Sequence, residues 1–117
     1  MRELHNSHIS FAEMGLSAKE EQRLTAAIRP FTEIRQIWVY GSRAMGNYRH
    51  GSDVDWALDA PEMTFQRFLA FKGALEDTNI LLKFDVLLLH QLEDEMLWEH
   101  LRRHARALVW EPVGVPT

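Results

Sequence analysis

The sequence GSRAMGNYRHGSDVD, residues 41–55, sets the organisation of this chain. An apolar run, residues 37–40, leads into it, and a second apolar run, residues 56–58, follows it. Asp53 and Asp55 are one residue apart, and on a strand that spacing directs both carboxylates to one face. Two such charges repel each other unless a cation lies between them, and hard carboxylate oxygens suit Mg²⁺. The pair therefore predicts a metal site, against the alternative of a charge pair in solvent at a strand edge.

The Gly41-Ser42 pair predicts the other half of a site. Glycine allows the backbone to approach a ligand closely. A short helix over Ser42 to Met45 would direct its first N–H groups outward, which favours a phosphate. A phosphate-holding turn beside a carboxylate pair indicates nucleoside-triphosphate chemistry. The P-loop pattern G-x-x-x-x-G-K-[ST] does not occur in the sequence, so the site is of another kind.

Gly-Ser followed after ten residues by Asp-x-Asp closely resembles the signature of the polymerase-beta-like nucleotidyltransferase superfamily. The stretch is most similar to the minimal nucleotidyltransferase branch, the antitoxin-like proteins paired with HEPN-domain toxins. The residues that indicate this branch are Arg43, Ala44, Gly46, Gly51 and Ser52. Trp56 departs from the branch, where an aliphatic residue is more usual, and this difference concerns packing.

The resemblance implies a two-Mg²⁺ site with ATP as substrate. Its catalytic and metal-binding residues would be Asp53, Asp55 and Asp85, the last on a third strand. Its nucleotide-binding residues would be Gly41, Ser42, Arg43 and Ser52. Two alternatives stay open: Asp85 as a buried carboxylate satisfied by backbone donors, and Arg43 as a solvated helix residue.

The resemblance also implies the reaction and the partner. The protein would be an adenylyltransferase antitoxin that moves AMP from ATP to a tyrosine of a cognate HEPN-type ribonuclease toxin and releases pyrophosphate. Two rivals remain: a catalytically idle antitoxin that acts by binding, and an enzyme that modifies a small molecule such as an aminoglycoside. Nothing in composition or spacing identifies the acceptor.

Composition limits the class of protein. The chain has 117 residues, which predicts one domain over residues 1–117. The formal net charge of -4 argues against direct nucleic-acid binding, since such proteins are usually basic. The sequence has no cysteine, no apolar N-terminal leader and no apolar run of membrane-spanning length. We therefore expect a cytoplasmic protein without a membrane partner.

The hydrophobic pattern predicts an α/β fold, with a small mixed sheet and flanking helices. Ser17 and Glu20 form a capping box for a first helix, and Thr64 caps a second long one. The expected strands are residues 34–40, 52–58, 81–89 and 108–110, and the last helix is residues 93–105. Apolar residues on both faces of 81–89 predict a central, doubly covered strand.

Helical spacing also predicts which side chains point inward. Those of the second long helix are Phe65, Phe68, Leu69, Lys72 and Leu75, and those of the last helix are Met96, Leu97, Leu101 and Ala105. Residues 1–15 are expected to be loose, and residues 111–117 to form an irregular tail. Phe11, Trp98 and Trp110 are expected in the core.

The last helix carries two further features. His100 and His104 have a spacing that can bind Zn²⁺, although a solvated face is the commoner explanation. Arg102, Arg103 and Arg106 form a basic cluster, which is usually helix surface and here could also attract an acidic partner.

Overall fold

The structure, a computed structural model, describes residue 4 and residues 7–110; the expected tail at 111–117 lies outside them. The strands are β1 (His8–Ile9), β2 (Gln36–Tyr40), β3 (Val54–Asp59), β4 (Phe84–Leu88) and β5 (Arg106–Leu108). The helices are α1 (Ala18–Ile28), α2 (Ser42–Met45), α3 (Phe65–Asp77) and α4 (Glu95–His104), with a short 3-10 turn, η1, at Leu89–Gln91. No helix among the described residues is long and apolar enough to cross a membrane.

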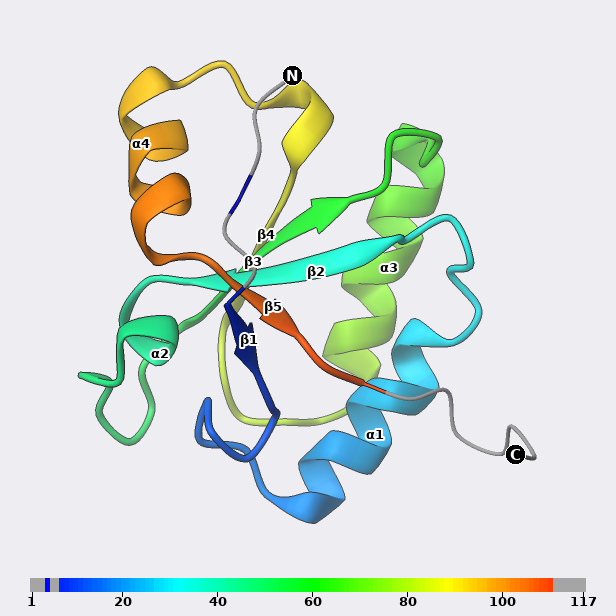
Figure 1. Ribbon diagram of the computed structural model, residues 1–117. Helices are drawn as coiled ribbons and strands as arrows, with labels where there is room; N and C mark the ends of the chain where they lie inside the picture. The colour runs from blue at the N-terminus through cyan, green and yellow to red at the C-terminus, as the bar shows by residue number, and fades with distance from the viewer. Residues whose placement is uncertain (1–3, 5–6, 111–117) are drawn as a thin grey trace.

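The five strands form one mixed sheet in the order β1-β5-β2-β3-β4 (Figure 1). β1 runs parallel to β5, and β3 runs parallel to β4. β2 is antiparallel to both of its neighbours, β3 and β5. The expected α/β fold on a small mixed sheet is therefore confirmed.

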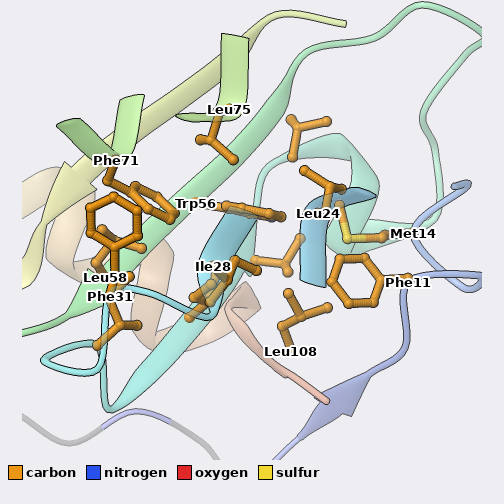
Figure 2. Close-up of a cluster of buried hydrophobic side chains, with 14 of the residues drawn as sticks. Phe11, Met14, Leu24, Ile28, Phe31, Trp56, Leu58, Phe71, Leu75 and Leu108 are labelled. Carbon is orange, nitrogen blue, oxygen red and sulfur yellow. The ribbon is translucent and has the colours of Figure 1, made fainter. Parts of the chain in front are cut away.

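Side chains alternate between two covered faces of this sheet, with α1 and α3 on one side and α4 on the other (Figure 1). The larger core lies under α1 and α3, where Trp56 is fully buried and packs edge-on against Phe84, with ring centroids 5.3 Å apart. Figure 2 shows Trp56 among the aromatic and aliphatic side chains of this core. The smaller core, under α4, contains Ala57, Leu101 and Ala105.

The helix starts follow local sequence. Ser17 Oγ accepts a hydrogen bond from the Glu20 amide, while a Glu20 carboxylate oxygen accepts one from the Ser17 amide. Thr64 Oγ1 accepts from the Arg67 amide at the start of α3. Both predicted caps are confirmed, and each stabilises its helix by about 1 kcal/mol.

The inward faces of two helices differ from the prediction. Phe65 and Leu69 on α3 are 66% and 50% exposed; the helix buries Leu75, as predicted, together with Phe71, which was not predicted. Met96, at the start of α4, is 84% exposed because it lies in the first turn, beyond the sheet face that Leu101 covers. Both errors come from assigning a helical face by spacing without knowing which strand lies beneath it.

The expectation of a central third strand is also wrong. β4 is an edge strand, and β3 is the strand whose residues are buried on both faces. A parallel edge strand covered on both faces gives the same apolar pattern as a central one, so the sequence does not distinguish them.

Residues 7–15, expected to be loose, are part of the fold. β1 pairs with β5, and Phe11 and Met14 are 1% and 0% exposed. Phe11 is buried as expected, whereas Trp98 and Trp110 are only partly buried. The turn after β1 therefore closes one end of the larger core.

Truncating Phe11 tests this correction. We expect Phe11→Ala to lower the free energy of unfolding by about 3–5 kcal/mol, because it removes a buried aromatic ring and leaves a cavity. The matched control is Val109→Ala at a half-exposed position, which should cost less than about 1 kcal/mol. Urea unfolding measures both. Equal midpoints for the two variants would show that the N-terminal segment is not part of the core.

Candidate active site

Three strand ends bring two of the predicted carboxylates together on the α4 side of the sheet. Asp55 on β3 is the register partner of Asp85 on β4 and of Tyr40 at the end of β2. Two residues along the same strands, Ala57, Leu87 and Trp38 belong to the α4-side core. Because residues two apart on a strand point to the same face, the side chains of Asp55, Asp85 and Tyr40 also lie on the α4 side. Asp53 lies just before β3, two residues from Asp55, and is exposed.

The electrostatics show that these carboxylates are crowded. Burial raises the pKa of Asp55 above its usual range, and the nearby charges of Asp85 and Asp53 raise it further, while Lys83 opposes the shift. Burial, with the charges of Asp55 and Asp85, raises the pKa of Tyr40 to about 12. The face thus concentrates negative charge, the condition under which a bound cation is favourable.

Gly41 is required by its conformation and by its neighbour. It has φ of 71° and ψ of -156°, a region that residues with a side chain rarely adopt. A Cβ added there would overlap Oδ2 of Asp55 and lie 3.3 Å from its Cγ. The glycine therefore lets the β2–α2 turn pass directly against the Asp55 carboxylate.

Asp85 is not the buried carboxylate, satisfied by backbone donors, that was raised as the alternative to a metal ligand. Its side chain is 45% exposed, and Lys83 Nζ lies 3.7 Å from its Oδ1. The exposure follows from the position of β4 at the sheet edge. Asp85 is thus a solvent-accessible carboxylate beside Asp55 and open to a ligand from solution.

The structure also revises the interpretation of Arg43. Its side chain is 3% exposed, so it is not a solvated helix residue. Its Nη1 donates to the carbonyl of Met14 at 2.8 Å, and its Nε and Nη2 donate to the carbonyl of Ser52 at 3.0 and 2.8 Å. Because these backbone carbonyls already accept the hydrogen bonds of the buried guanidinium, Arg43 is better interpreted as a structural residue than as a nucleotide-binding one.

Ser42 and Ser52 occupy different parts of the site. Ser42 is the first residue of α2, directly after Gly41, as predicted. Ser52 closes the turn before Asp53: its Oγ accepts from the Arg49 amide at 2.8 Å, and its amide donates to the Arg49 carbonyl at 3.0 Å. Ser42 thus lies beside the carboxylates, whereas Ser52 shapes the loop that presents Asp53.

The donor set fits Mg²⁺ in chemistry but is not closed around an ion. Asp53, Asp55 and Asp85 supply the hard oxygen ligands that Mg²⁺ prefers. Among the described residues, no group of three or more His, Cys, Asp or Glu side chains converges closely enough to hold a metal ion. His100 and His104 belong to no such group; their rings are tilted at 50° to each other with centroids 4.9 Å apart.

Sequence reasoning missed two residues of this site. Tyr40 reaches the carboxylate face because it ends β2 opposite Asp55, and Lys83 because it precedes β4. The alternation of residues 36–40 marks the face of Tyr40, but only the strand pairing shows that this face is also that of Asp55.

A glycine turn and a pair of neighbouring carboxylates, Asp55 and Asp85, lie together on the α4 side of this mixed α/β sheet. The family model described as "Polymerase beta, Nucleotidyltransferase" matches residues 22–109, more than half of the chain. The chain therefore belongs to the polymerase beta nucleotidyltransferase family.

Two further comparisons were made with known proteins. No curated protein matches the chain. Among solved structures, the chain is similar to a protein from Sulfolobus solfataricus described as a candidate nucleotidyltransferase, with 17% sequence identity and a TM-score of 0.41. The match covers 80% of this chain and 89% of that one.

Proposed function

We propose that this protein transfers AMP from ATP to a tyrosine hydroxyl of a partner protein, in a reaction that depends on Mg²⁺. The observation that carries the proposal is the pairing of Asp55 with Asp85, with Gly41 against the Asp55 carboxylate and Asp53 two residues away, within a nucleotidyltransferase-family domain. Metal-dependent phosphoryl and nucleotidyl transfer needs little more from a protein than positioning and charge neutralisation.

In this proposal each part of the site has one task. Asp53, Asp55 and Asp85 would hold two Mg²⁺ ions, and a bound Mg²⁺ neutralises charge on the phosphates and on the departing pyrophosphate. Ser42 and the adjacent N–H groups would meet the β- and γ-phosphates. Gly41, which has no side chain, would leave the space beside the Asp55 carboxylate free for the nucleotide.

The atoms of the reaction balance without another reactant. The acceptor oxygen forms a bond to the α-phosphorus of ATP, and the bond from that phosphorus to the bridging oxygen breaks. Pyrophosphate leaves with the electron pair, and the phenolic proton passes to solvent. A tyrosine, with a pKa of about 10, loses this proton more readily than a serine does.

The exposure of the site favours an acceptor presented by a second molecule. Asp53 is exposed and Asp85 is half exposed, so a hydroxyl on another protein has access to the face they share. Productive transfer requires that hydroxyl within about 3–3.5 Å of the phosphorus. The motif's resemblance to the antitoxins of HEPN pairs supports a HEPN-type ribonuclease toxin as this second molecule.

The test is co-incubation with ATP, Mg²⁺ and a HEPN-type protein encoded by the adjacent gene. We expect the partner to gain the mass of one or more AMP units on tyrosine, to lose its toxicity, and to stay unmodified with Asp53→Asn. An unmodified partner whose toxicity is still suppressed would support inhibition by binding alone. Modification of an aminoglycoside, with no labelled protein, would support a small-molecule acceptor.

Substituting Asp85 is expected to affect the transfer step without affecting ATP binding. We expect Asp85→Asn to retain ATP binding and to lower kcat by about a hundredfold or more, the pattern of an interaction made in the transition state. The control is Lys83→Met, which removes the ion pair but keeps the carboxylate and should leave kcat within about threefold of wild type. Single-turnover transfer measures both. A wild-type kcat for Asp85→Asn would make Asp85 a structural residue.

A further inference from the structure

Arg43 is a buried cation held entirely by backbone carbonyls and an aromatic ring. Its guanidinium carbon lies 4.9 Å from the centroid of the Tyr48 ring. A buried charge is tolerated only where hydrogen bonds replace its hydration, and the planar guanidinium fork can serve several acceptors at once. The contacts of Arg43 therefore identify the segments that depend on it.

The hydrogen bonds of Arg43 join three segments of the chain, one of which, the turn at Met14, is remote in sequence from the other two. Met14 belongs to the turn after β1, Arg43 to α2, and Ser52 to the loop between α2 and β3. Ser52 accepts two of the three hydrogen bonds, and its backbone continues directly into Asp53. The guanidinium thus joins the N-terminal turn to the loop that presents a proposed metal ligand.

The N-terminal side of this contact has no free space. Gly15 has φ of 92°, and an added Cβ would lie 2.7 Å from Tyr48 Cε2 and 2.8 Å from Arg43 Nη1. Arg43 Nη1 is held by its hydrogen bond to the Met14 carbonyl, and the Tyr48 ring lies against the same guanidinium. A change at Gly15 is therefore transmitted to Arg43 and Tyr48, although Gly15 belongs to a segment remote in sequence from the carboxylates.

We propose that Arg43 is a positioning residue that sets the place of Asp53 relative to Asp55 through the Ser52 carbonyl. Asp53 itself is exposed and precedes β3, so strand pairing does not fix it. The hydrogen bonds from Arg43 supply the missing constraint one residue away. The proposal rests on the proposed function only in taking Asp53 as a metal ligand.

The test compares Arg43→Met with Arg43→Lys and with the exposed control Arg49→Met. Two readouts are measured at a temperature where every variant is folded: Mn²⁺ affinity in the presence of a non-hydrolysable ATP analogue, and amide exchange. We expect Arg43→Met to weaken Mn²⁺ binding about 10–100-fold, as for loss of a group that orients a ligand. Arg43→Lys should not restore affinity, because a single nitrogen would replace the planar fork whose three nitrogens donate to the two carbonyls. Arg49→Met should match wild type.

Amide exchange follows the loop independently of metal binding. The amides of Arg49 and Ser52 are hydrogen-bonded within the turn. We expect them to exchange at least about tenfold faster in Arg43→Met, while the Val54 amide, bonded to the Lys83 carbonyl, stays protected. Gly15→Ala should reproduce both effects from outside the site, and it decides the question if Arg43→Met does not fold.

The outcomes distinguish this inference from the proposed function. Wild-type Mn²⁺ affinity and loop protection in Arg43→Met, or in Gly15→Ala, would overturn the positioning role. Recovery of affinity in Arg43→Lys would overturn it too, because charge alone would then be sufficient. If wild-type protein binds no Mn²⁺, the proposed metal site fails, and unchanged or faster loop exchange still decides the role of Arg43.

Discussion

Replacing Asp53 or Asp55 by Asn is expected to abolish Mg²⁺-dependent ATP binding while the protein remains folded. Each substitution removes a negative ligand from the carboxylate face, and the remaining oxygens hold the ion at least about tenfold less tightly. Isothermal calorimetry with Mg²⁺ or Mn²⁺ measures the loss. The matched control is Asp59→Asn, at the opposite end of the same strand, which should bind as wild type does. Unchanged ATP affinity in the Asp53→Asn, Asp55→Asn double mutant would refute the metal site.

The same change at Asp55 has an expected effect on the metal-free protein. The folded-state pKa of Asp55 is raised by burial and by Asp85 and Asp53, so its ionisation destabilises the fold. This penalty is absent below the unfolded-state pKa, develops as pH rises toward the folded-state pKa, and persists above it. Asp55→Asn should therefore raise Tm more at pH 7 than at pH 3.5. Thermal scans at both pH values measure this, and an equal shift at both would contradict the repulsion.

Gly41→Ala is expected to have the second large effect. The backbone conformation at Gly41 alone costs an alanine about 1–3 kcal/mol, and the new Cβ must also displace the carboxylate of Asp55. We expect a lower urea midpoint together with loss of Mn²⁺ binding. The two effects share one cause, since the methyl group occupies the space that the turn leaves for Asp55.

Gly46→Ala is the matched control for that substitution. Gly46 also has a positive φ, 82°, but an added Cβ would have no atom within 4 Å. It should lose about 1 kcal/mol of stability and keep its metal affinity. If Gly41→Ala binds Mn²⁺ as Gly46→Ala does, the close passage of the turn over Asp55 is not needed by the site.

The local part of this fold could be predicted from the sequence. The capping box of α1, the Thr64 cap of α3, the glycine turn and the side-chain alternation within each strand all depend on residues near one another in the chain. The order of the strands could not, because His8 pairs with Ala107 across most of the sequence and no local pattern marks that pairing. The assignment of β4 as central failed because apolar residues on both faces do not show which strands lie beside it.

The residues of the candidate site, too, were predictable from the sequence only where local spacing identifies them. The spacing of Asp53 and Asp55 identified the carboxylate pair, and the apolar run around Asp85 marked that residue as unusual. Arg43 was misassigned because its partners are the carbonyls of Met14 and Ser52, and a backbone acceptor leaves no trace in the sequence. An arginine in a sequence suggests an anionic partner such as a phosphate. A buried arginine can instead donate its hydrogen bonds to backbone carbonyls, as Arg43 does.

The position of β5 has a consequence for how the protein assembles. Among the strands of the described residues β5 comes last in the sequence, yet it lies between β1, which comes first, and β2. During synthesis β1 therefore has no neighbour to pair with until Arg106–Leu108 has been made, whereas β2, β3 and β4 can already associate. Pairing over so long a separation is slow, and the first segment stays exposed to other chains in the meantime. The emerging chain would thus form the β2-β3-β4 part of the sheet before β1 is paired, and the loop before Asp53, which Arg43 joins to the Met14 turn, would be fixed last.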